Sequence, residues 1–319
     1  MLLFLQYIVL YVMYLVSFII VMSSEDWFLI WLGLEVNMMS FLILVYRRDS
    51  MSSIECCMKY FFIQGLGSAL LIGFFYMNKY GGVGIINMIL SFKIGAGPFF
   101  YWFPSMCSGL TWVSCYVLMV LQKMLPLFLI SLSIHWILWL VLMMSLVLGV
   151  VGSFNQSNIK QLLAYSSIHH LGWIMIIMMS GSVNWMLYLV MYSFMLLGII
   201  LVLVENEVVD LHMMYKCKGS MWFSIGMLSL AGMPPLLGFF LKWMALSYLT
   251  DMMYYIAMLI VASVIMLYVY MRLMYDIIMM GGVKSSWIEV DESMFTYNYD
   301  IVSMVGLLLG VMMGIMLIM

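Results

Sequence analysis

Charged residues are scarce in this chain. Lysine, arginine, aspartate and glutamate make up 8% of its 319 residues, whereas they make up about a quarter of a typical soluble domain. Apolar residue types make up 67%, and the mean hydropathy is +1.15. This composition excludes a soluble globular protein and predicts an integral membrane protein. The formal net charge of −2 also gives no basic surface that would attract nucleic acid.

The usual sequence patterns of cofactor sites are missing as well. The five cysteines show no C-x-x-C spacing, and Cys56 and Cys57 are simply adjacent. No strand leads into a G-x-G-x-x-G turn, and the glycine-rich run "QGLGSALLIG" (64–73) lies in an apolar segment, where close helix packing explains it better. We therefore expect the chain to bind no nucleotide, metal or other cofactor and to carry no redox centre.

Long apolar runs dominate the sequence. A hydrocarbon core of about 30 Å needs about 20 apolar residues per helix, and this rule divides the chain into eleven candidate spans. The runs do not alternate as the strands of a membrane barrel do. We expect an all-α, polytopic transmembrane helix bundle that forms a single domain over residues 1–319. The spans lie near 1–22, 24–45, 57–77, 83–103, 111–132, 134–153, 162–181, 184–204, 221–246, 252–272 and 301–319.

The first span and the basic loop residues predict how the chain enters the membrane. The first run has no basic leader and no small-residue cleavage site, so we expect a retained span and no signal or transit peptide. An odd number of spans places the termini on opposite sides. The basic side is the cytoplasm-like or matrix-like side, and it holds the N-terminus. Its basic residues are Arg47, Arg48, Lys160, Lys216, Lys218, Arg272 and Lys284, with Lys79 opposite.

Two segments near the C-terminus are expected to make contacts outside the bundle core. The connection 273–300 is the largest polar segment and is expected to be solvated or to touch a partner. Gly306, Gly310 and Gly314 repeat at four-residue spacing in the last span, a pattern typical of a close helix-packing face. That face would pack either inside the bundle or against another subunit.

A few ionisable residues remain at mid-span depth. Each lysine or carboxylate at a helix centre costs about 2.5–3.5 kcal/mol on insertion scales, so a functional role is the first hypothesis. The alternative is snorkelling, in which a long lysine stem carries its charge to the membrane surface. Snorkelling is the better explanation for Lys59, near the start of its span. The mid-span residues are Glu35, Lys93, Lys123, Lys242, His169 and His170.

Lys123 lies near the middle of its span in "LQKMLP", beside Gln122 and Pro126. Proline removes a backbone hydrogen bond and exposes the carbonyl one turn earlier, at Gln122. In lipid that carbonyl needs a side chain or water, so the sequence predicts a hydrated pocket here. The alternative is a kink that serves packing only.

Glu35 lies in "WLGLEVNMMSF" with Asn37 and Ser40 close by. An unpaired buried charge is unstable, so pairing Glu35 with a lysine would solve the problem for both residues. Coupled groups of this kind suit a proton relay, because moving one proton shifts the next. A buried ion pair with a structural role only is the alternative.

Two spans carry helix-breaking residues beside a lysine. The ninth contains Pro234 and Pro235, which we expect to break the helix about one turn after Ala231, with Lys242 following. The fourth, near 83–103, carries "FKIGAGPFFYWFP" (92–104), where Lys93 precedes two glycines and two prolines. Spans four and nine cross the membrane in opposite directions, which indicates an inverted repeat. Broken helices in such transporters face an ion path at the midplane.

The histidine pair follows Ser166 and Ser167. Adjacent helical residues point about 100° apart, so one of His169 and His170 is expected to face a given path. Histidine both gives and takes a proton near neutral pH. A histidine bonded only to a helix carbonyl is the default interpretation for the other.

These motifs, in this order, resemble one known family. It is the chain 2 family of the proton-pumping NADH:ubiquinone oxidoreductase, respiratory complex I, an antiporter-like membrane subunit in its short mitochondrial form. The motifs that carry the resemblance are "WLGLEVN" (31–37), "CMKYFFIQ" (57–64), "FKIGAGPFFYWFP" (92–104), "LQKMLP" (121–126), "NQSNIKQLLAYSSIHHLGWIM" (155–175) and "AGMPPLLGFFLKW" (231–243).

The resemblance implies a multi-pass subunit of the mitochondrial inner membrane, with its N-terminus in the matrix and its C-terminus facing the intermembrane space. It would move protons along a buried hydrophilic axis, coupled to NADH oxidation and ubiquinone reduction elsewhere in the complex. Its partners would be the other membrane-arm subunits, neighbouring antiporter-like subunits among them, together with inner-membrane lipids and protons. As a core subunit it belongs to the enzyme without performing redox chemistry itself.

The resemblance also assigns roles to residues. Lys123 would be the central relay lysine, Glu35 and Lys93 the coupled pair that sets its proton affinity, and Lys242 the link toward the exit or the neighbouring subunit. The family's single histidine before "LGW" falls on His170, while His169 replaces a small residue. Three further positions depart from the family pattern: Phe100 stands in place of a histidine, Ser105 in place of an acidic residue and Leu241 in place of a proline.

Two other function classes share these features. A stand-alone monovalent cation/proton antiporter would also need buried lysines and broken helices. A structural scaffold would use the charges only to lock helices together.

Overall fold

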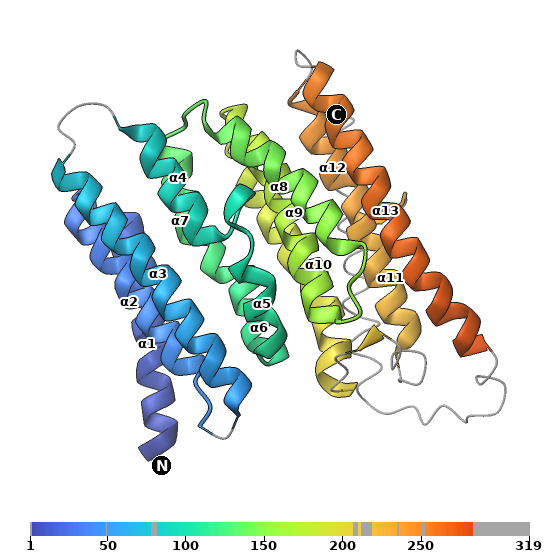
Figure 1. The fold of residues 1–319 in the computed structure, drawn as a ribbon, viewed down its shortest axis with the longest axis horizontal. Helices are drawn as coiled ribbons and strands as arrows, with labels where there is room; N and C mark the ends of the chain where they lie inside the picture. The colour runs from blue at the N-terminus through green and yellow to red at the C-terminus, as the bar shows by residue number, and fades with distance from the viewer. Residues whose placement is uncertain are drawn as a thin grey trace. The chain divides into compact units, whose positions relative to one another are not determined.

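The computed structural model describes residues 2–48, 50–77, 82–206, 210–211, 219–234, 236–249 and 253–282. Over these residues the chain is helical, and its single extended feature is an isolated antiparallel bridge between Asn158 and Asp210. The all-α prediction is confirmed for this part of the chain (Figure 1). The elements are α1 (Leu2–Ser23), α2 (Trp27–Val45), α3 (Met51–Met77), α4 (Val83–Ile94), the 3₁₀ turn η1 (Gly97–Phe99), α5 (Trp102–Gly109), α6 (Trp112–Met119), α7 (Leu121–Leu132), α8 (Leu138–Ser153), α9 (Ile159–Met179), α10 (Trp185–Asn206), α11 (Ser220–Ala231), α12 (Leu237–Ser247) and α13 (Met253–Gly282).

The helices lie where the apolar runs predict them, as far as the described residues extend. Over that part of the chain, six stretches are long and apolar enough to cross a bilayer, and a bent pair, Val83–Phe99 with Trp102–Gly109, is a seventh. The described parts of α1, α8, α11 and α12 are apolar but shorter. The count of eleven spans stays a prediction. The six stretches are Trp27–Val45, Met51–Tyr76, Trp112–Leu132, Ile159–Met179, Trp185–Asn206 and Tyr254–Tyr275.

Some predictions near the C-terminus lie outside the described residues. Among them are the span 301–319 with its glycine ridge, most of the connection 273–300, and Pro235. Two boundaries are wrong: α13 continues to Gly282, so the predicted connection does not begin at 273, and α3 begins at Met51 and not near 57. The run "YMRLMYDIIMM" (270–280) keeps enough apolar residues to extend the helix beyond the bilayer length.

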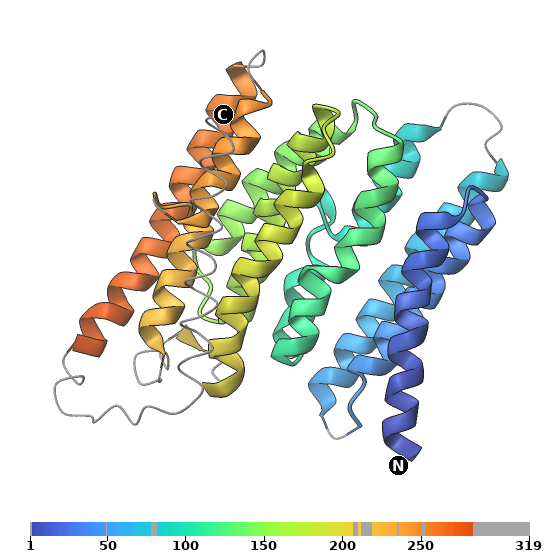
Figure 2. The same cartoon turned by 180° about the vertical axis from the view of Figure 1, so that it is seen from behind.

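The chain forms two compact units, Met1–Met144 and Ser145–Met319. In the first, α2 packs between α1 and α3, α4 packs against α3 and α7, and α5 packs against α3. Figure 2 shows α1 lying along its neighbours in this unit. In the second, α10 packs against α9, α11 and α12, and α13 covers α11. The single domain over 1–319 stays a prediction.

A sharp bend follows Lys93, as the glycines and prolines of 92–104 predict. The helix α4 ends at Ile94, and Gly95 closes it in the left-handed conformation, with φ of +74°. Gly97 also has a positive φ, and a Cβ there would lie 3.0 Å from the carbonyl oxygen of Val141. The two halves of the span, before and after this turn, are bent by 90°. The broken helix near 83–103 is confirmed, and its second half continues to Gly109.

The second break has a different cause from the one predicted. The helix α11 ends at Ala231, and Gly232, with φ of +82°, donates backbone hydrogen bonds to Leu228 and Ser229 as a left-handed cap. The helix is therefore already closed before Pro234, not one turn after Ala231. The helix α12 restarts at Leu237. The predicted break within 221–246 is confirmed, but a glycine ends the helix before the prolines.

The span that contains Lys123 is also interrupted. The helices α6 and α7 meet at Val120, whose φ and ψ of −114° and −69° are distorted from regular helical values. Pro126 lies inside α7. The interruption thus precedes Gln122, where the proline was expected to disturb the helix, and Lys123 lies in the first turn after it.

Candidate functional site

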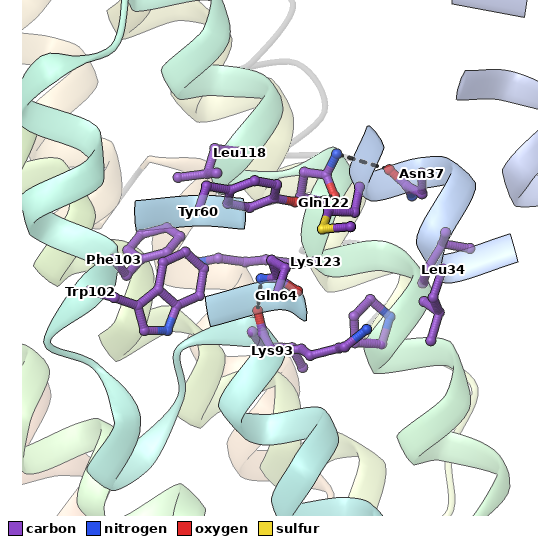
Figure 3. A pocket seen from close by; sticks show the side chains of 14 residues that line it. Leu34, Asn37, Tyr60, Gln64, Lys93, Trp102, Phe103, Leu118, Gln122 and Lys123 are labelled. Atoms are coloured by element: carbon purple, nitrogen blue, oxygen red, sulfur yellow. Dashed lines mark hydrogen bonds between the residues drawn. The ribbon is translucent and has the colours of Figure 1, made fainter. Parts of the chain in front are cut away.

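A small polar cavity lies within the first unit, among α2 to α7 (Figure 3). It offers about 20 Å³ of room for a water-sized sphere, and about 10–15 Å³ is needed to hold one water molecule. A polar pocket is therefore present beside Lys123, as predicted, and the cavity has room for a single water. Its polar lining residues are Asn37, Tyr60, Gln64, Lys93, Gln122 and Lys123.

The lysines predicted at mid-span depth are buried in protein. Lys93, Lys123 and Lys242 are 6%, 3% and 8% exposed. Lys59, by contrast, has a side chain that is 44% exposed and pairs with Glu55 one helical turn away, at 2.5 Å. Snorkelling therefore does not explain the three buried lysines, whereas the exposed position of Lys59 is confirmed.

Lys123 reaches the cavity from the first turn of α7. Its Nζ lies 4.4 Å from the centroid of the Phe103 ring on α5, within cation–π range. The ring face is negative, so it partly replaces water around the ammonium group. Figure 3 shows the stem of Lys123 extending toward Phe103.

Lys93 enters the same cavity from the last turn of α4, and α3 holds it there. The side-chain amide of Gln64 donates a 2.8 Å hydrogen bond to the Lys93 carbonyl oxygen. A Cβ at Gly67 would lie 2.8 Å from Cγ of Lys93, so the glycine leaves the room that the lysine stem fills. The close packing predicted for 64–73 is thus confirmed at Gly67. The side chain that packs against this glycine is Lys93, one of the predicted functional residues.

Glu35 is half-buried on α2 and does not line the cavity. Its charge acts on Lys93, but in the described part of the chain the ion pair found within 4 Å is Lys59 with Glu55. Direct pairing of Glu35 with a lysine is therefore not seen.

A hydrogen-bonded chain crosses the unit beside Lys123. The Tyr60 hydroxyl on α3 donates to Oε1 of Gln122 at 3.1 Å, and Nε2 of Gln122 donates to Oδ1 of Asn37 at 2.9 Å. The chain links α3, α7 and α2 through the residue next to Lys123. Polar side chains within apolar spans need hydrogen-bond partners, so the sequence did indicate such contacts. It drew attention to Asn37 and Gln122, but not to Tyr60.

The second unit contains Lys242. From α12 its Nζ donates a 2.6 Å hydrogen bond to the carbonyl oxygen of Ala231, the last residue of α11. Carbonyls at a helix end have no partner within the helix, and the helix dipole favours a cation there. The broken helix thus provides both the polar partner and the favourable field for this buried lysine.

The two histidines of α9 have different surroundings. His170 Nδ1 is hydrogen-bonded to the Tyr188 hydroxyl of α10 at 2.9 Å, and its ring lies 4.7 Å from that of Tyr192. His169 accepts a 3.1 Å hydrogen bond from the indole of Trp173, and the charge of Lys242 acts on it. The indole partner of His169 and its position relative to Lys242 were not predicted from the sequence.

The family was established by comparison with known proteins. A profile of the transmembrane domain shared by NADH:quinone oxidoreductase and Mrp antiporter subunits matches residues 24–90 and 82–267. NADH-ubiquinone oxidoreductase chain 2 of Anopheles gambiae is 32% identical over 297 residues, which cover 86% of this chain and 87% of the relative. This chain belongs to the chain 2 family.

Solved structures confirm the fold of the chain 2 family member. A chain of respiratory complex I from Thermus thermophilus, with bound aureothin, superposes with a TM-score of 0.82 at 21% identity, covering 97% of this chain and 78% of the other. A chain of the Mrp complex from Dietzia sp. gives a TM-score of 0.71 at 14% identity, covering 97% and 75%. The fold is therefore the antiporter-like one.

The predicted position of one lysine in this chain 2 family member was wrong. Lys160 was counted among the loop charges, but it lies in the first turn of α9, where Oδ1 of Asn158 accepts its backbone N–H at 2.9 Å, and its side chain is buried. The signal was the sequence "SNIK", in which an asparagine N-cap starts the helix before the lysine. In the described part of the chain, no cluster of His, Cys, Asp or Glu would hold a metal ion.

Proposed function

We propose that the chain is a proton-translocating membrane subunit of respiratory complex I in the mitochondrial inner membrane. It moves protons along buried lysine, histidine and glutamate side chains, driven by NADH oxidation and ubiquinone reduction in other subunits. One observation carries the proposal: Lys93 and Lys123 line the same buried cavity, which has room for one water, in a member of the chain 2 family.

The first unit supplies the relay. Water in the cavity accepts a proton from one lysine ammonium and donates a proton to the neutral amine of the other. Burial disfavours the charged form of each lysine, so the protonated and neutral forms become closer in free energy. Modest changes in nearby charge then decide which of the two lysines holds the proton. Glu35 provides such a charge at Lys93. Tyr60 and Gln122 add further groups that can donate or accept beside Lys123.

The second unit carries the proton onward. Lys242, bound to the end of α11, exchanges charge with the histidines of α9 and links the path to the exit or to a neighbouring subunit. The contact between α12 and α9 supports this step, because it places His169 within the field of Lys242. His170, with its hydroxyl partner Tyr188, is the second proton carrier on α9.

The finer architecture is also part of the proposal. We infer eleven spans, with the N-terminus in the matrix, and an inverted repeat that relates the broken span of Lys93 to that of Lys242. The support is that each compact unit contains a glycine-capped helix break beside a buried lysine, at Lys93 in the first unit and at Lys242 in the second. Other membrane-arm subunits and inner-membrane lipids are the expected partners, and the chain itself performs no redox chemistry. Moving one charge against 100 mV takes about 2.3 kcal/mol. This free energy equals a change of under about two units in the pKa of a relay lysine.

Replacing Lys123 tests the function. We expect Lys123→Arg, in the intact complex, to reduce coupled NADH oxidation and proton translocation more than about tenfold, because arginine does not release its proton. Lys59→Arg is the matched control, since this lysine is exposed on α3. Normal proton translocation in Lys123→Arg, with the complex fully assembled, contradicts the proposal. Loss of assembly with normal pumping in the residual complex favours the scaffold role.

A stand-alone monovalent cation/proton antiporter is the second candidate. The fold similarity to a chain of the Mrp complex favours it. The chain reconstituted by itself in liposomes would then exchange sodium or potassium for protons across the membrane. A proton-translocating subunit that depends on quinone reduction shows no such exchange alone.

A further inference from the structure

A second, larger cavity in the first unit has no role in the proton path. It has a volume of about 390 Å³ and shares no lining residue with the polar cavity. Sites that bind organic ligands measure about 300–1,000 Å³ and are mostly apolar with a few polar groups. The size and lining of this cavity therefore match those of a ligand site.

The cavity opens at one end of the helices. Its lining includes residues from the start of α2, the end of α3 and the start of α4, and Figure 1 shows these three helix ends at the same end of the unit. Trp27 and Phe75 stack there, with ring centroids 4.3 Å apart. Aromatic residues, tryptophan above all, concentrate at the membrane surface, so the mouth lies at the level of the lipid head groups.

The mouth presents a hydrogen-bond donor beside an acceptor. Ser24 lines the cavity, and its hydroxyl is buried without a hydrogen-bond partner among the described residues. An unpartnered buried hydroxyl is destabilising, so a bound group would stabilise it. Glu25 also lines the mouth, is exposed and forms no ion pair with the described residues. An ionised carboxylate only accepts hydrogen bonds.

The body of the cavity is apolar. Ile30, Leu71, Leu90 and Leu129 line it from α2, α3, α4 and α7 and are otherwise buried. From Val83 at the start of α4 to Leu90 the helix rises about 10 Å, so the cavity reaches into the hydrocarbon region. Ser133, the remaining polar lining residue, already donates to Asn87 at 2.9 Å. An occupant thus needs an apolar tail and a head that complements both Ser24 and Glu25.

We propose that this cavity binds one acyl chain of a bilayer phospholipid whose head group carries a primary ammonium, as in phosphatidylethanolamine. The Ser24 hydroxyl donates to a phosphate oxygen, and the Glu25 carboxylate accepts a charge-assisted hydrogen bond from the ammonium. A choline head has no N–H group to donate to Glu25, and a glycerol head has no positive charge. The tail fills the space between α2 and α4, the helix that carries Lys93.

Photolabelling of the intact complex tests this site. The complex is reconstituted in vesicles that contain a phospholipid with a photoactivatable group in its acyl chain and an ethanolamine, choline or glycerol head. We expect the ethanolamine lipid to label peptides from the start of α2, the end of α3 and α4. Equal labelling of these peptides by the choline lipid overturns the proposal.

Two pairs of matched variants separate the head site from the tail site. Glu25→Gln is expected to lower labelling by the ethanolamine lipid about two- to fivefold, the usual effect of losing an exposed ion pair. Asp26→Asn, outside the lining, leaves it unchanged. Leu71→Trp fills the cavity and abolishes labelling, whereas Leu70→Trp, on the exposed side of α3, does not. If Leu71→Trp prevents assembly, the Glu25 pair decides. Labelling that neither Glu25→Gln nor Leu71→Trp lowers overturns the site.

Discussion

The ammonium group of Lys242 donates a 2.6 Å hydrogen bond to the carbonyl oxygen of Ala231, the last residue of α11. The lysine and the broken helix therefore depend on each other. Without the break, the Ala231 carbonyl would be used within the helix. Without the lysine, a helix end in the membrane would lack a donor.

Removing this lysine should reduce both stability and coupling. We expect Lys242→Met to destabilise the subunit by about 1–3 kcal/mol, because the Ala231 carbonyl loses its partner in a buried place. Proton translocation should fall with it. Thermal inactivation of the complex and acidification of membrane vesicles measure the two effects. Lys242→Arg, which keeps a donor but does not release a proton, should restore stability and not translocation.

The glycine cap beside Lys242 offers an independent test. Gly232→Ala places a Cβ 3.0 Å from Nζ of Lys242 and forces alanine into a left-handed conformation, which costs about 1–2 kcal/mol. We expect lower thermal stability and slower coupled oxidation. Gly181→Ala is the matched control, because it has a similar positive φ but nothing within 4 Å of its Cβ. It should show the loss of stability alone, and an equal loss of activity would contradict the link to Lys242.

Gly67 should matter for activity more than its neighbour Gly65. A methyl group at Gly67 would lie 2.8 Å from Cγ of Lys93, whereas a Cβ at Gly65 meets nothing within 4 Å. Gly67→Ala should displace the lysine and slow proton translocation. Gly65→Ala should be neutral or stabilise α3 by about 0.5–1 kcal/mol, because alanine is the better helix former. Equal activity of the two variants in a quinone-dependent pumping assay would show that the position of Lys93 does not limit the rate.

The bridge made by Gln122 should behave as a unit with Tyr60. Gln122→Leu leaves the Tyr60 hydroxyl and Oδ1 of Asn37 without the partners seen here, at a cost of about 1–3 kcal/mol. Tyr60→Phe removes only one end of the chain. In a double-mutant cycle on translocation rate, the combined variant should lose less than the sum of the two single variants. Additive losses would show that the two residues act separately.

The histidines can be separated through their different partners. Tyr188→Phe removes the hydroxyl bonded to His170, and Trp173→Phe removes the indole donor to His169. If His170 carries protons, as the resemblance implies, Tyr188→Phe should slow translocation more than Trp173→Phe. The opposite order would assign the path to His169, whose electrostatic partner is Lys242.

Much of this site was predictable from the sequence, because a charge in a long apolar run is expensive enough to stand out. That reasoning identified Lys93, Lys123 and Lys242 and the breaks beside two of them. The contacts of these lysines could not be predicted, because they depend on which helix faces pack together. The contact of Phe103 with Lys123 and the distance between Glu35 and Lys93 are properties of packing and leave no periodic signal.

The break before Lys242 shows a second limit. Prolines draw attention because they cannot continue a helix, yet Gly232 had already closed α11 in a left-handed turn before Pro234. Glycine occurs in many spans, so its use as a cap is visible only when φ is known. The misplacement of Lys160 has a similar origin, because helix starts are less certain from sequence than helix centres.

In an 18-residue window of α9, 89% of the residues are buried, and the helix carries Lys160, His169 and His170. During synthesis it enters the bilayer before α10 and α12 exist to surround it. Until α10 arrives, His170 lacks the Tyr188 hydroxyl that partners it in the folded chain. The enclosure of α9 thus sets an order of assembly, in which the polar groups of an apolar helix find their protein partners only when α10 and α12 pack around it.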